Sequence, residues 1–362
     1  MLFSLVLSTA LFAAGGSQPA ASAGGKSYNL TFATVIGSVY QFPVYVAREK
    51  GWFKDKGLNL KEANFTNGPV MVEALGKDGW DLGISGIGGQ IPGVITYNAT
   101  YIAPINTDDG TQHLFVRNNS PILAAGTGKN SLSPKIYGDA ASWKGKKVLC
   151  NTGAVLHFFL IKVLSGFNLT PSDIQFMAMD VTTAGSAFRA GEGDIVAMTG
   201  SGGVMSMLAD PNYKAVAAGP WVDTGLMGVA YAPKPALADP AKREAMKVFL
   251  RVYYDSIKWI YDKANYKEAI DMLVDFSEEM GIAMNRASAE FYLNIDSFYS
   301  KQDAVKMMTD KAPGKNYSVL EQRIVNVLQF FIDTGSRKQG DVEKLIGNVD
   351  PSILQELLKE SK

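Results

Sequence analysis

Short apolar runs, typical of buried strands, alternate with longer amphipathic stretches through the first two thirds of the chain. The first block predicts strands at 28–34, 58–62, 80–84 and 101–105, with helices between them at 43–50, 68–76 and 90–97. The alternation returns after residue 146, with strands at 147–150, 174–179 and 195–199 and helices at 155–165 and 183–190. This order predicts an α/β protein whose sheets are mostly parallel and covered by helices on both faces.

The last third of the chain has helical periodicity instead. It predicts helices at 243–263, 266–280, 287–292, 303–310, 319–334 and 352–358. We therefore expect two α/β blocks followed by a helical region.

The two blocks contain a repeat in constant register. Residues 74–82 parallel residues 187–195 at a shift of 113 positions. In each stretch a helix ends at glycine, Asp81 or Asp194 introduces a buried strand, and a turn rich in Gly, Ser or Thr follows at 85–89 or 199–203. The repeat predicts two lobes built on one plan, with a cleft between them.

An uncharged apolar run at 2–14 opens the chain, and small residues ending in Ala21, Ser22 and Ala23 follow it. This layout is typical of a secretory signal that is cleaved after Ala23. The run is shorter than the roughly 20 apolar residues of a membrane-spanning helix. No Lys or Arg precedes it, which departs from the usual signal, and a buried N-terminal element is the alternative. We expect an exported, periplasmic protein with a signal peptide at 1–23 and a linker at 24–27.

Composition narrows the possible chemistry. Lys plus Arg and Asp plus Glu both number 35, so the balanced charge provides no electrostatic footprint for nucleic acid. Cys150 is the single cysteine, which excludes an internal disulfide framework, and His113 and His157 are too few for a His-based metal centre. We expect no cofactor, no metal and no nucleic-acid partner.

Motifs for nucleotide and acyl chemistry are also missing. Residues 127–131 come nearest to a P-loop but have no preceding glycine at the required spacing, and residues 83–86 lack the spacing of a nucleophile elbow. His157 lies on an apolar stretch that predicts packing or capping, whereas His113 follows a polar turn and could face a ligand. No residue is assigned a catalytic role.

Turns at the carboxyl ends of the predicted strands are the candidate binding residues, because ligands of open α/β sheets bind there. These turns are rich in small or hydroxylated residues and lead into helices, whose N-terminal N–H groups favour anionic or accepting ligand groups. The alternative for each turn is an ordinary helix cap. The candidates are Ser38, Tyr40, Gln41, Phe42, Ser85, Gly86, Ile87, Thr152, Gly153, Ala154, Thr182, Thr183 and, near a predicted lobe crossing, Trp221. Asp108, Asp109 and Asp223 could receive an ammonium group or be solvated turn residues.

Residues 42–58 resemble the opening signature of substrate-binding proteins of the nitrate, sulfonate and taurine importer family, which includes thiamine-pyrimidine-precursor binders. Residues 143–148, 153–158 and 191–195 are similar to later segments of that family. The resemblance extends over roughly 32–205.

The resemblance implies a type II periplasmic-binding-protein fold: two α/β lobes, two crossing strands and C-terminal helices. Lobe 1 would comprise 28–115 and 226–362, lobe 2 would comprise 116–225, and the crossings would lie at 114–116 and 228–231. The family's ligand-contacting turns correspond to 38–42, 85–87, 152–154 and 182–183. None of these turns holds Lys or Arg, which disfavours a bare inorganic anion such as nitrate.

The expected function is that of an extracytoplasmic solute-binding protein. It would deliver a small polar organic ligand (sulfonate-like, zwitterionic or heterocyclic) to an ABC permease in the inner membrane by cleft closure, as a monomer. An enzyme on the same fold, acting on a small pyrimidine- or carboxylate-type substrate, is the first alternative. A sensory ligand-binding protein is the second. The signal sequence and the shortage of catalytic groups favour a binding protein.

Overall fold

The computed structural model describes residues 26–66, 68–77, 79–108, 110–152, 155–295, 297–333, 335 and 337–360. The predicted signal at 1–23 lies outside these ranges, as do Gly153, Ala154 and Asp109 of the sequence-derived candidates.

The first five-stranded sheet has the order β2-β1-β3-β10-β4. Its strands are β1 (Tyr28–Val35), β2 (Leu58–Phe65), β3 (Leu82–Gly86), β4 (Ala99–Thr107) and β10 (Met227–Pro233). β1 pairs in parallel with β2 and β3, whereas β10 is antiparallel to both of its neighbours, β3 and β4. We call the part of the chain built on this sheet lobe 1.

The second sheet repeats this plan with the order β7-β6-β8-β5-β9. Its strands are β5 (His113–Arg117), β6 (Lys147–Cys150), β7 (Gln175–Ala178), β8 (Ile195–Met198) and β9 (Tyr213–Ala218). β6 is parallel to β7 and β8, and β5 runs antiparallel to β8 and β9. We call the part built on it lobe 2. The mostly parallel sheets expected from the sequence are confirmed, with one reversed strand in each.

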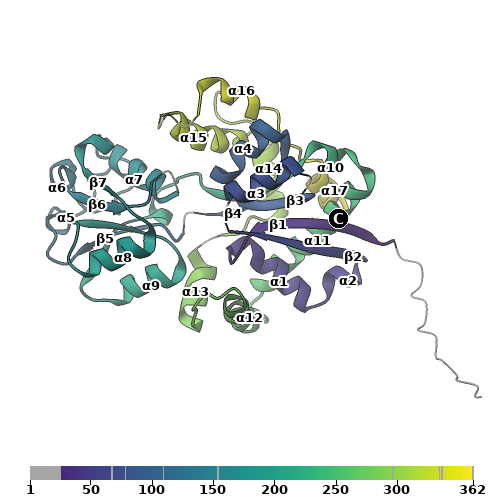
Figure 1. Cartoon of the computed structure of the whole chain (residues 1–362), viewed down its shortest axis with the longest axis horizontal. Coiled ribbons are helices and arrows are strands. Elements are labelled where there is room, and N and C mark those ends of the chain that lie inside the picture. The colour runs from purple at the N-terminus through teal and green to yellow at the C-terminus, as the bar shows by residue number, and fades with distance from the viewer. Residues whose placement is uncertain are drawn as a thin grey trace, which may run out of the picture.

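The chain passes between the lobes twice (Figure 1). It leaves β4 for β5 through 108–112, and it leaves β9 for β10 through 219–226. The residues expected to form the crossings, 114–116 and 228–231, are instead the reversed strands β5 and β10 themselves. Their apolar, β-branched composition suits inner strands of a sheet, which is why they stand out in the sequence.

Helices cover both faces of the first sheet, with α3 and α4 on one side and α1 and α11 on the other (Figure 1). The helices between its strands are α1 (Phe42–Glu49), α2 (Trp52–Asp55), α3 (Gly68–Glu73) and α4 (Ile87–Tyr97). Lobe 2 contains α5 (Pro121–Ala124), α6 (Ala140–Trp143), α7 (Val155–Ser165), α8 (Val181–Arg189) and α9 (Ser201–Ala209).

The C-terminal third is helical, as predicted, and returns to lobe 1. It consists of α10 (Lys234–Ala238), α11 (Pro240–Ile260), α12 (Tyr266–Glu279), α13 (Arg286–Ile295), α14 (Lys301–Thr309), α15 (Val319–Asp333), α16 (Val342–Leu345) and α17 (Ser352–Glu360). α11 begins where Asp239 accepts hydrogen bonds from the first-turn N–H groups of Ala241 and Lys242. It packs on β1, α14 and α17 pack on β4, and α15 and α16 pack on α4. None of the helices among the described residues is long and apolar enough to cross a bilayer.

Each lobe has its own hydrophobic core. The large lobe 1 core includes the buried rings of Phe32, Tyr101, Tyr231 and Phe249. The lobe 2 core includes Trp143 and Phe159 on one face of the second sheet, and Phe115 and Phe188 form a separate cluster. Two cores explain why a chain of this length forms two lobes.

The repeated aspartate has the same structural role in both lobes. Asp81 precedes β3, its carboxylate accepts a hydrogen bond from Thr31 N at 2.8 Å, and its own N–H donates to Thr31 O. Asp194 precedes β8 and makes the same two bonds with the backbone of Lys147, again at 2.8 Å from the N–H to the carboxylate. The constant register therefore marks the point where two parallel strands of each sheet are joined.

Replacing either aspartate with Ala tests this role. Each change leaves a strand N–H without its carboxylate acceptor, and the loss of a hydrogen bond to a charged group costs about 1.5–3 kcal/mol. We expect a lower urea midpoint for both variants. Asp81→Ala should show the larger fall, because Asp81 also pairs with Lys242 at 2.8 Å and is less exposed than Asp194. Asp55→Ala, on the exposed side of α2, is the control; unchanged midpoints in both test variants would refute the shared role.

Candidate functional site

A cavity of about 1100 Å³ lies between the lobes, beside both crossings. The carboxyl ends of four parallel strands reach it: β1 through Val35, β3 through Ser85, β6 through Asn151 and β8 through Thr199. The crossings contribute Asp108, Thr111, Gln112 and Leu226. The remaining lining residues come from η1 (Val39–Gln41), the starts of α3, α4 and α7, and the C-terminal helices: Tyr40, Thr66, Gly68, Pro69, Val70, Gly86, Ile87, Gly88, Gly89, Ile91, Pro92, Leu156, Phe158, Val327, Phe330, Phe331 and Arg337.

The start of α4 forms one wall of the cavity. Gly86 is the N-cap residue and offers no side chain to cap the helix. The Ser85 hydroxyl beside it is buried and makes no hydrogen bond of ordinary geometry among the described residues. Burial raises the pKa of the neighbouring Tyr231 hydroxyl, and Ser85 lowers it by a smaller amount. The Ser85 hydroxyl therefore lies beside the Tyr231 hydroxyl and presents a polar group at this wall.

The first crossing brings a carboxylate to the cavity. Tyr40 OH donates to Asp108 Oδ2 at 3.0 Å, which fixes both side chains where lobe 1 ends. The ring of Tyr40 lies close against Gly228 of β10, because a Cβ added at Gly228 would come within 2.6 Å of that ring and 2.3 Å of Asn106 Oδ1. A glycine is therefore required at position 228 for Tyr40 to reach Asp108.

Two further residues of this crossing hold it in place. Gln112 Nε2 donates to Asp108 O at 3.0 Å, and the Gln112 Oε1 on the other side of the amide is buried without a partner among the described residues. The Thr111 and Thr199 hydroxyls lie 2.9 Å apart, which connects the crossing to the end of β8 in lobe 2. The side of the cavity that contains the Asp108 carboxylate is thus connected to both lobes.

Aromatic side chains from both lobes meet on another wall. Phe158 of α7, in lobe 2, belongs to the lobe 1 core and lies 5.1 Å from the ring of Phe330 on α15. His157 contacts the same Phe330 ring edge-on at 5.7 Å. These contacts hold the lobes together and leave apolar surface from Phe158, Phe330 and Phe331 facing the cavity.

Arg337 is the basic residue that lines the cavity. Its backbone N–H donates to Phe331 O at 3.0 Å, which turns the segment after α15 back toward the lobes. Lys344 lowers the pKa of the Asp341 carboxyl, and the Arg337 guanidinium contributes to the same shift, so Arg337 has a carboxylate within electrostatic reach. The sequence offered no sign of this residue, because it follows a C-terminal helix and not a strand of either sheet.

Five of the sequence-derived candidates line the cavity: Tyr40, Ser85, Gly86, Ile87 and Asp108. Ser38 lies just outside, with its hydroxyl 3.3 Å from Thr34 Oγ1. Gln41 is buried and donates to Asn64 Oδ1 at 2.9 Å. Phe42 is fully buried against Phe276 in the cluster under α12, so the structure places it in the core.

The lobe 2 candidates lie mostly away from the cavity. Thr152 is exposed, although Asn151 and Leu156 on either side of that turn line the cavity. Thr182 and Thr183 are exposed at the start of α8, where Thr183 N donates to Asp180 as an ordinary helix cap. Trp221 packs half-buried against the lobe 2 core. Gly153 and Ala154 lie outside the described residues.

Groups with catalytic potential are buried outside the cavity. Burial lowers the pKa of His113 to about 4, and its ring stacks on Phe115. Burial also lowers the pKa of His157 and raises the pKa of the Cys150 thiol to about 12. Among the described residues, no three His, Cys, Asp or Glu side chains are grouped to hold a metal ion. The cavity itself provides binding groups: a carboxylate, a guanidinium, hydroxyls and apolar rings.

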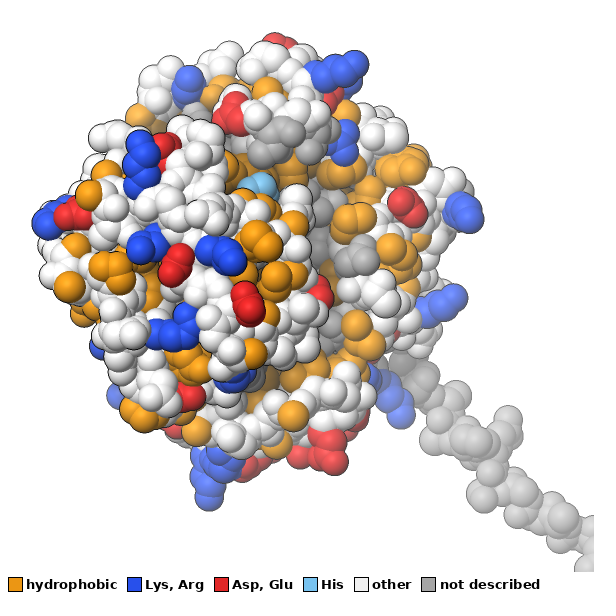
Figure 2. Space-filling model, turned by 60° about the vertical axis from the view of Figure 1, so that its left-hand side comes forward, with side chains coloured by type: hydrophobic (Ala, Val, Ile, Leu, Met, Phe, Trp, Pro, Cys, Tyr) orange, Lys and Arg blue, Asp and Glu red, His pale blue; other side chains and the backbone are white. Residues whose placement is uncertain are grey.

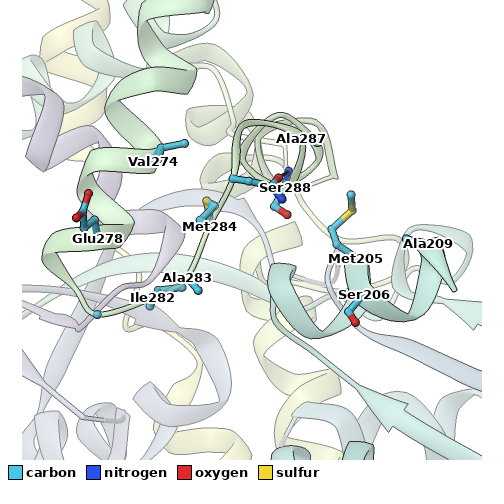
Figure 3. Close-up of a pocket in the computed structure, with 12 residues that line it drawn as sticks. Met205, Ser206, Ala209, Val274, Glu278, Ile282, Ala283, Met284, Ala287 and Ser288 are labelled. Atoms are coloured by element: carbon cyan, nitrogen blue, oxygen red, sulfur yellow. Dashed lines mark hydrogen bonds between the residues drawn. The ribbon is translucent and has the colours of Figure 1, made fainter. Parts of the chain in front are cut away.

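A second hollow of about 860 Å³ lies between the lobes where α9 faces α12 and α13 (Figure 3). The sides of these helices and the turn at 281–285 line it, including Met205, Ile282 and Met284. Strand ends do not reach it, and none of the buried polar atoms that lack partners belongs to it. We therefore place the candidate site in the first cavity.

Charges of both signs are mixed on the face of the molecule seen in Figure 2. Figure 2 shows Lys, Arg, Asp and Glu side chains interspersed over one face, with hydrophobic side chains along the furrow between the lobes. The net formal charge of zero agrees with this mixture.

Known proteins share this fold and part of this sequence. Residues 38–91 match the family model described as NMT1/THI5 like. A putative ABC transporter periplasmic binding protein of Brachyspira hyodysenteriae is 29% identical over 199 residues, which cover 55% of this chain and 57% of that protein. The chain thus spans little more than half the length of this curated relative.

Two solved structures extend the likeness over nearly the whole chain. The periplasmic aliphatic sulphonate binding protein SsuA of Escherichia coli has a TM-score of 0.68 at 17% identity, covering 89% of this chain and 92% of its own. The periplasmic nitrate-binding protein NrtA of Synechocystis has a TM-score of 0.61 at 13% identity, covering 92% and 89%. At such low identity these matches establish the fold, and the chain has the two-lobed periplasmic-binding-protein fold that its sequence predicts.

The buried His113 makes stability depend on pH. Its pKa is about 4 in the folded protein and near 6.5 in an unfolded chain, so between these values the unfolded state binds the proton. The free energy of unfolding therefore falls as the pH is lowered through this window. We expect wild type to lose about 2 kcal/mol more between pH 7 and pH 5 than His113→Gln does, measured by urea unfolding. Equal losses would show that His113 is not buried in its neutral form.

The thiol of Cys150 should be unreactive in the native protein. With a pKa of about 12 it is protonated at pH 8, and the thiolate is the reactive form. We expect Ellman's reagent to label the native protein only slowly, and to label one thiol per chain at once in guanidinium chloride. Rapid labelling of the native protein would reveal an accessible, activated cysteine.

Proposed function

We propose that this protein is the extracytoplasmic solute-binding component of an ABC importer, which holds one small organic molecule between its lobes. The observation that carries the proposal is a cavity lined by the strand ends of both lobes and by both crossings. A ligand there contacts lobe 1 and lobe 2 at once, so it stabilises the closed arrangement over any open one. A partner can then distinguish the closed, ligand-bound protein from the open, empty protein.

The chemistry of the cavity supports binding and not turnover. Its ionisable lining residues are Tyr40, Asp108 and Arg337, while His113, His157 and Cys150 do not line it. General acid–base catalysis needs a group of suitable pKa within hydrogen-bond reach of the substrate. The relative named as a putative ABC transporter periplasmic binding protein favours the same interpretation.

The partner and the location follow from the same proposal. The permease would sit in the inner membrane and meet both lobes of the closed protein, which would act as a monomer in the periplasm after export by the signal at 1–23. Neither nucleic acid nor a cofactor takes part. Binding to such a permease does not require a surface charge of one sign, so the balanced charge of the chain is compatible with it.

Native mass spectrometry of gently purified protein tests the function. We expect one co-purified small molecule per chain, released on denaturation and identified by chromatography. Isothermal titration with that compound should give a stoichiometry of one, and the compound should be recovered intact after overnight incubation. Steady consumption of the compound would overturn the proposal in favour of an enzyme on the same fold.

A matched pair of variants locates the bound compound. Gly88→Leu projects a side chain from the start of α4 into the cavity, where an added Cβ meets Phe331 only at an ordinary 3.6 Å. Ser206→Leu adds similar bulk to the second hollow between α9 and α12. We expect Gly88→Leu to abolish binding with an unchanged melting temperature and Ser206→Leu to bind normally. The reverse result would move the site to the second hollow.

A further inference from the structure

Helix α13 comes from the C-terminal part of the chain that returns to lobe 1, yet it contacts both lobes. It packs on α12 on the lobe 1 side and on α9 on the lobe 2 side. Figure 3 shows α13 at the edge of the second hollow, between α12 and α9. The contact of Phe158 with Phe330 lies at the first cavity, so α13 forms a separate bridge between the lobes.

The spacing of apolar residues explains how one helix can contact both lobes. Ala289 and Leu293 are four positions apart and share one face of α13, and both are buried in the cluster under α12. Phe291 lies two positions from each of them, which places it about 200° around the helix. It is half-buried and packs with the lobe 2 cluster that contains Val204 and Met207 of α9. α13 therefore has one face for each lobe.

Hydrogen bonds attach α13 and the segment after it to lobe 1. Tyr261 OH, at the end of α11, donates to Leu293 O at 3.0 Å. Beyond the helix, Tyr299 N donates to Ile105 O of β4 at 2.8 Å. The second bond joins the chain to the last turn of strand before the crossing at 108–112. α13 is thus anchored where lobe 1 ends, and Phe291 extends from it to lobe 2.

The position of Phe291 separates its contact from the binding of a ligand. Phe291 does not belong to the described residues that line the first cavity, nor to those that line the second hollow. A change of this side chain therefore leaves the walls of both spaces intact. Its contact can influence the cavity only through the arrangement of the lobes.

We propose that α13 is a strap that holds the lobes together when no ligand is bound, with Phe291 as the residue that contacts lobe 2. When the lobes separate, α13 stays with lobe 1 and Phe291 leaves the lobe 2 cluster. Apolar surface on Phe291, Val204 and Met207 is then exposed to water, which is unfavourable. The strap therefore raises the population of the closed arrangement before any molecule enters the cavity.

Spin labels on the two lobes measure their arrangement without a ligand. Asp275 on α12 and Ser186 on α8 are exposed, and Asp275→Cys and Ser186→Cys provide the two labelling positions. Cys150 is buried, so it stays unlabelled in the native protein. Unfolding of the labelled protein in guanidinium chloride, followed by refolding, removes bound small molecules. Double electron–electron resonance then gives the distribution of distances between the lobes.

Phe291→Ala should allow the lobes to separate. We expect a single distance population when Phe291 is present and a second, longer population in Phe291→Ala. The ratio of separated to closed molecules should rise by about tenfold or more, because the variant loses a half-buried aromatic ring from the contact. Phe291→Leu keeps part of the apolar contact and should give a distribution closer to that of wild type. Circular dichroism should show the same helix content in all variants.

Tyr292→Ala is the matched control on the same helix. Tyr292 is also half-buried, but its ring packs against the two clusters on the lobe 1 side. We expect its replacement to keep the wild-type distribution. An unchanged distribution in Phe291→Ala, or an equal change in Tyr292→Ala, would overturn the strap. Lobes that are already separated in the ligand-free protein with Phe291 intact would overturn it as well.

The outcomes separate the strap from the proposed function. The distances are measured without a ligand, so they do not depend on which molecule the cavity binds. Consumption of the co-purified compound would overturn the solute-binding function and leave the strap in place. An unchanged distance distribution in Phe291→Ala would overturn the strap and leave the function in place.

Discussion

The structure depends on two inserted strands. After each crossing between the lobes, the first strand of the chain enters the middle of the sheet that it has reached. β5 enters the second sheet between β8 and β9, and β10 returns to the first sheet between β3 and β4. Each is an inner strand, so its backbone groups are paired on both sides. Removing either strand would leave two rows of buried polar groups without partners. Each lobe therefore depends on a strand that follows directly from a crossing.

This insertion also determines where a ligand can bind. The two crossings connect the sheets on the side where β1, β3, β6 and β8 end, so strand ends from both lobes open into one space. The first crossing runs through that space and contributes Asp108 from a backbone held by Gln112.

Local features of the sequence predicted part of this arrangement. The register of Asp81 with Asp194 marks equivalent strand junctions, and the turn at 85–87 lines the cavity, because strand ends and turn residues are short-range signals. The sequence did not reveal that Phe42 packs on Phe276, a residue more than two hundred positions away, or that Arg337 reaches the cavity. Both depend on how the C-terminal helices fold back onto lobe 1. The sequence likewise predicted the crossings at 114–116 and 228–231, which belong to β5 and β10. Apolar composition alone does not distinguish an inner strand from the segment that leads to it.

Apolar and charged contacts act differently on closure. Phe158 lies in the lobe 1 core, and Phe291 of α13 packs against a lobe 2 cluster, so apolar contacts between the lobes favour the arrangement seen in the structure whether or not a ligand is present. Asp108 and Arg337 instead place charged groups in the cavity lining, where a ligand can contact them. A ligand shifts the equilibrium only by interactions that differ between the open and closed states. The aromatic contacts therefore act with or without a ligand, whereas the polar and charged lining acts through the ligand that contacts it.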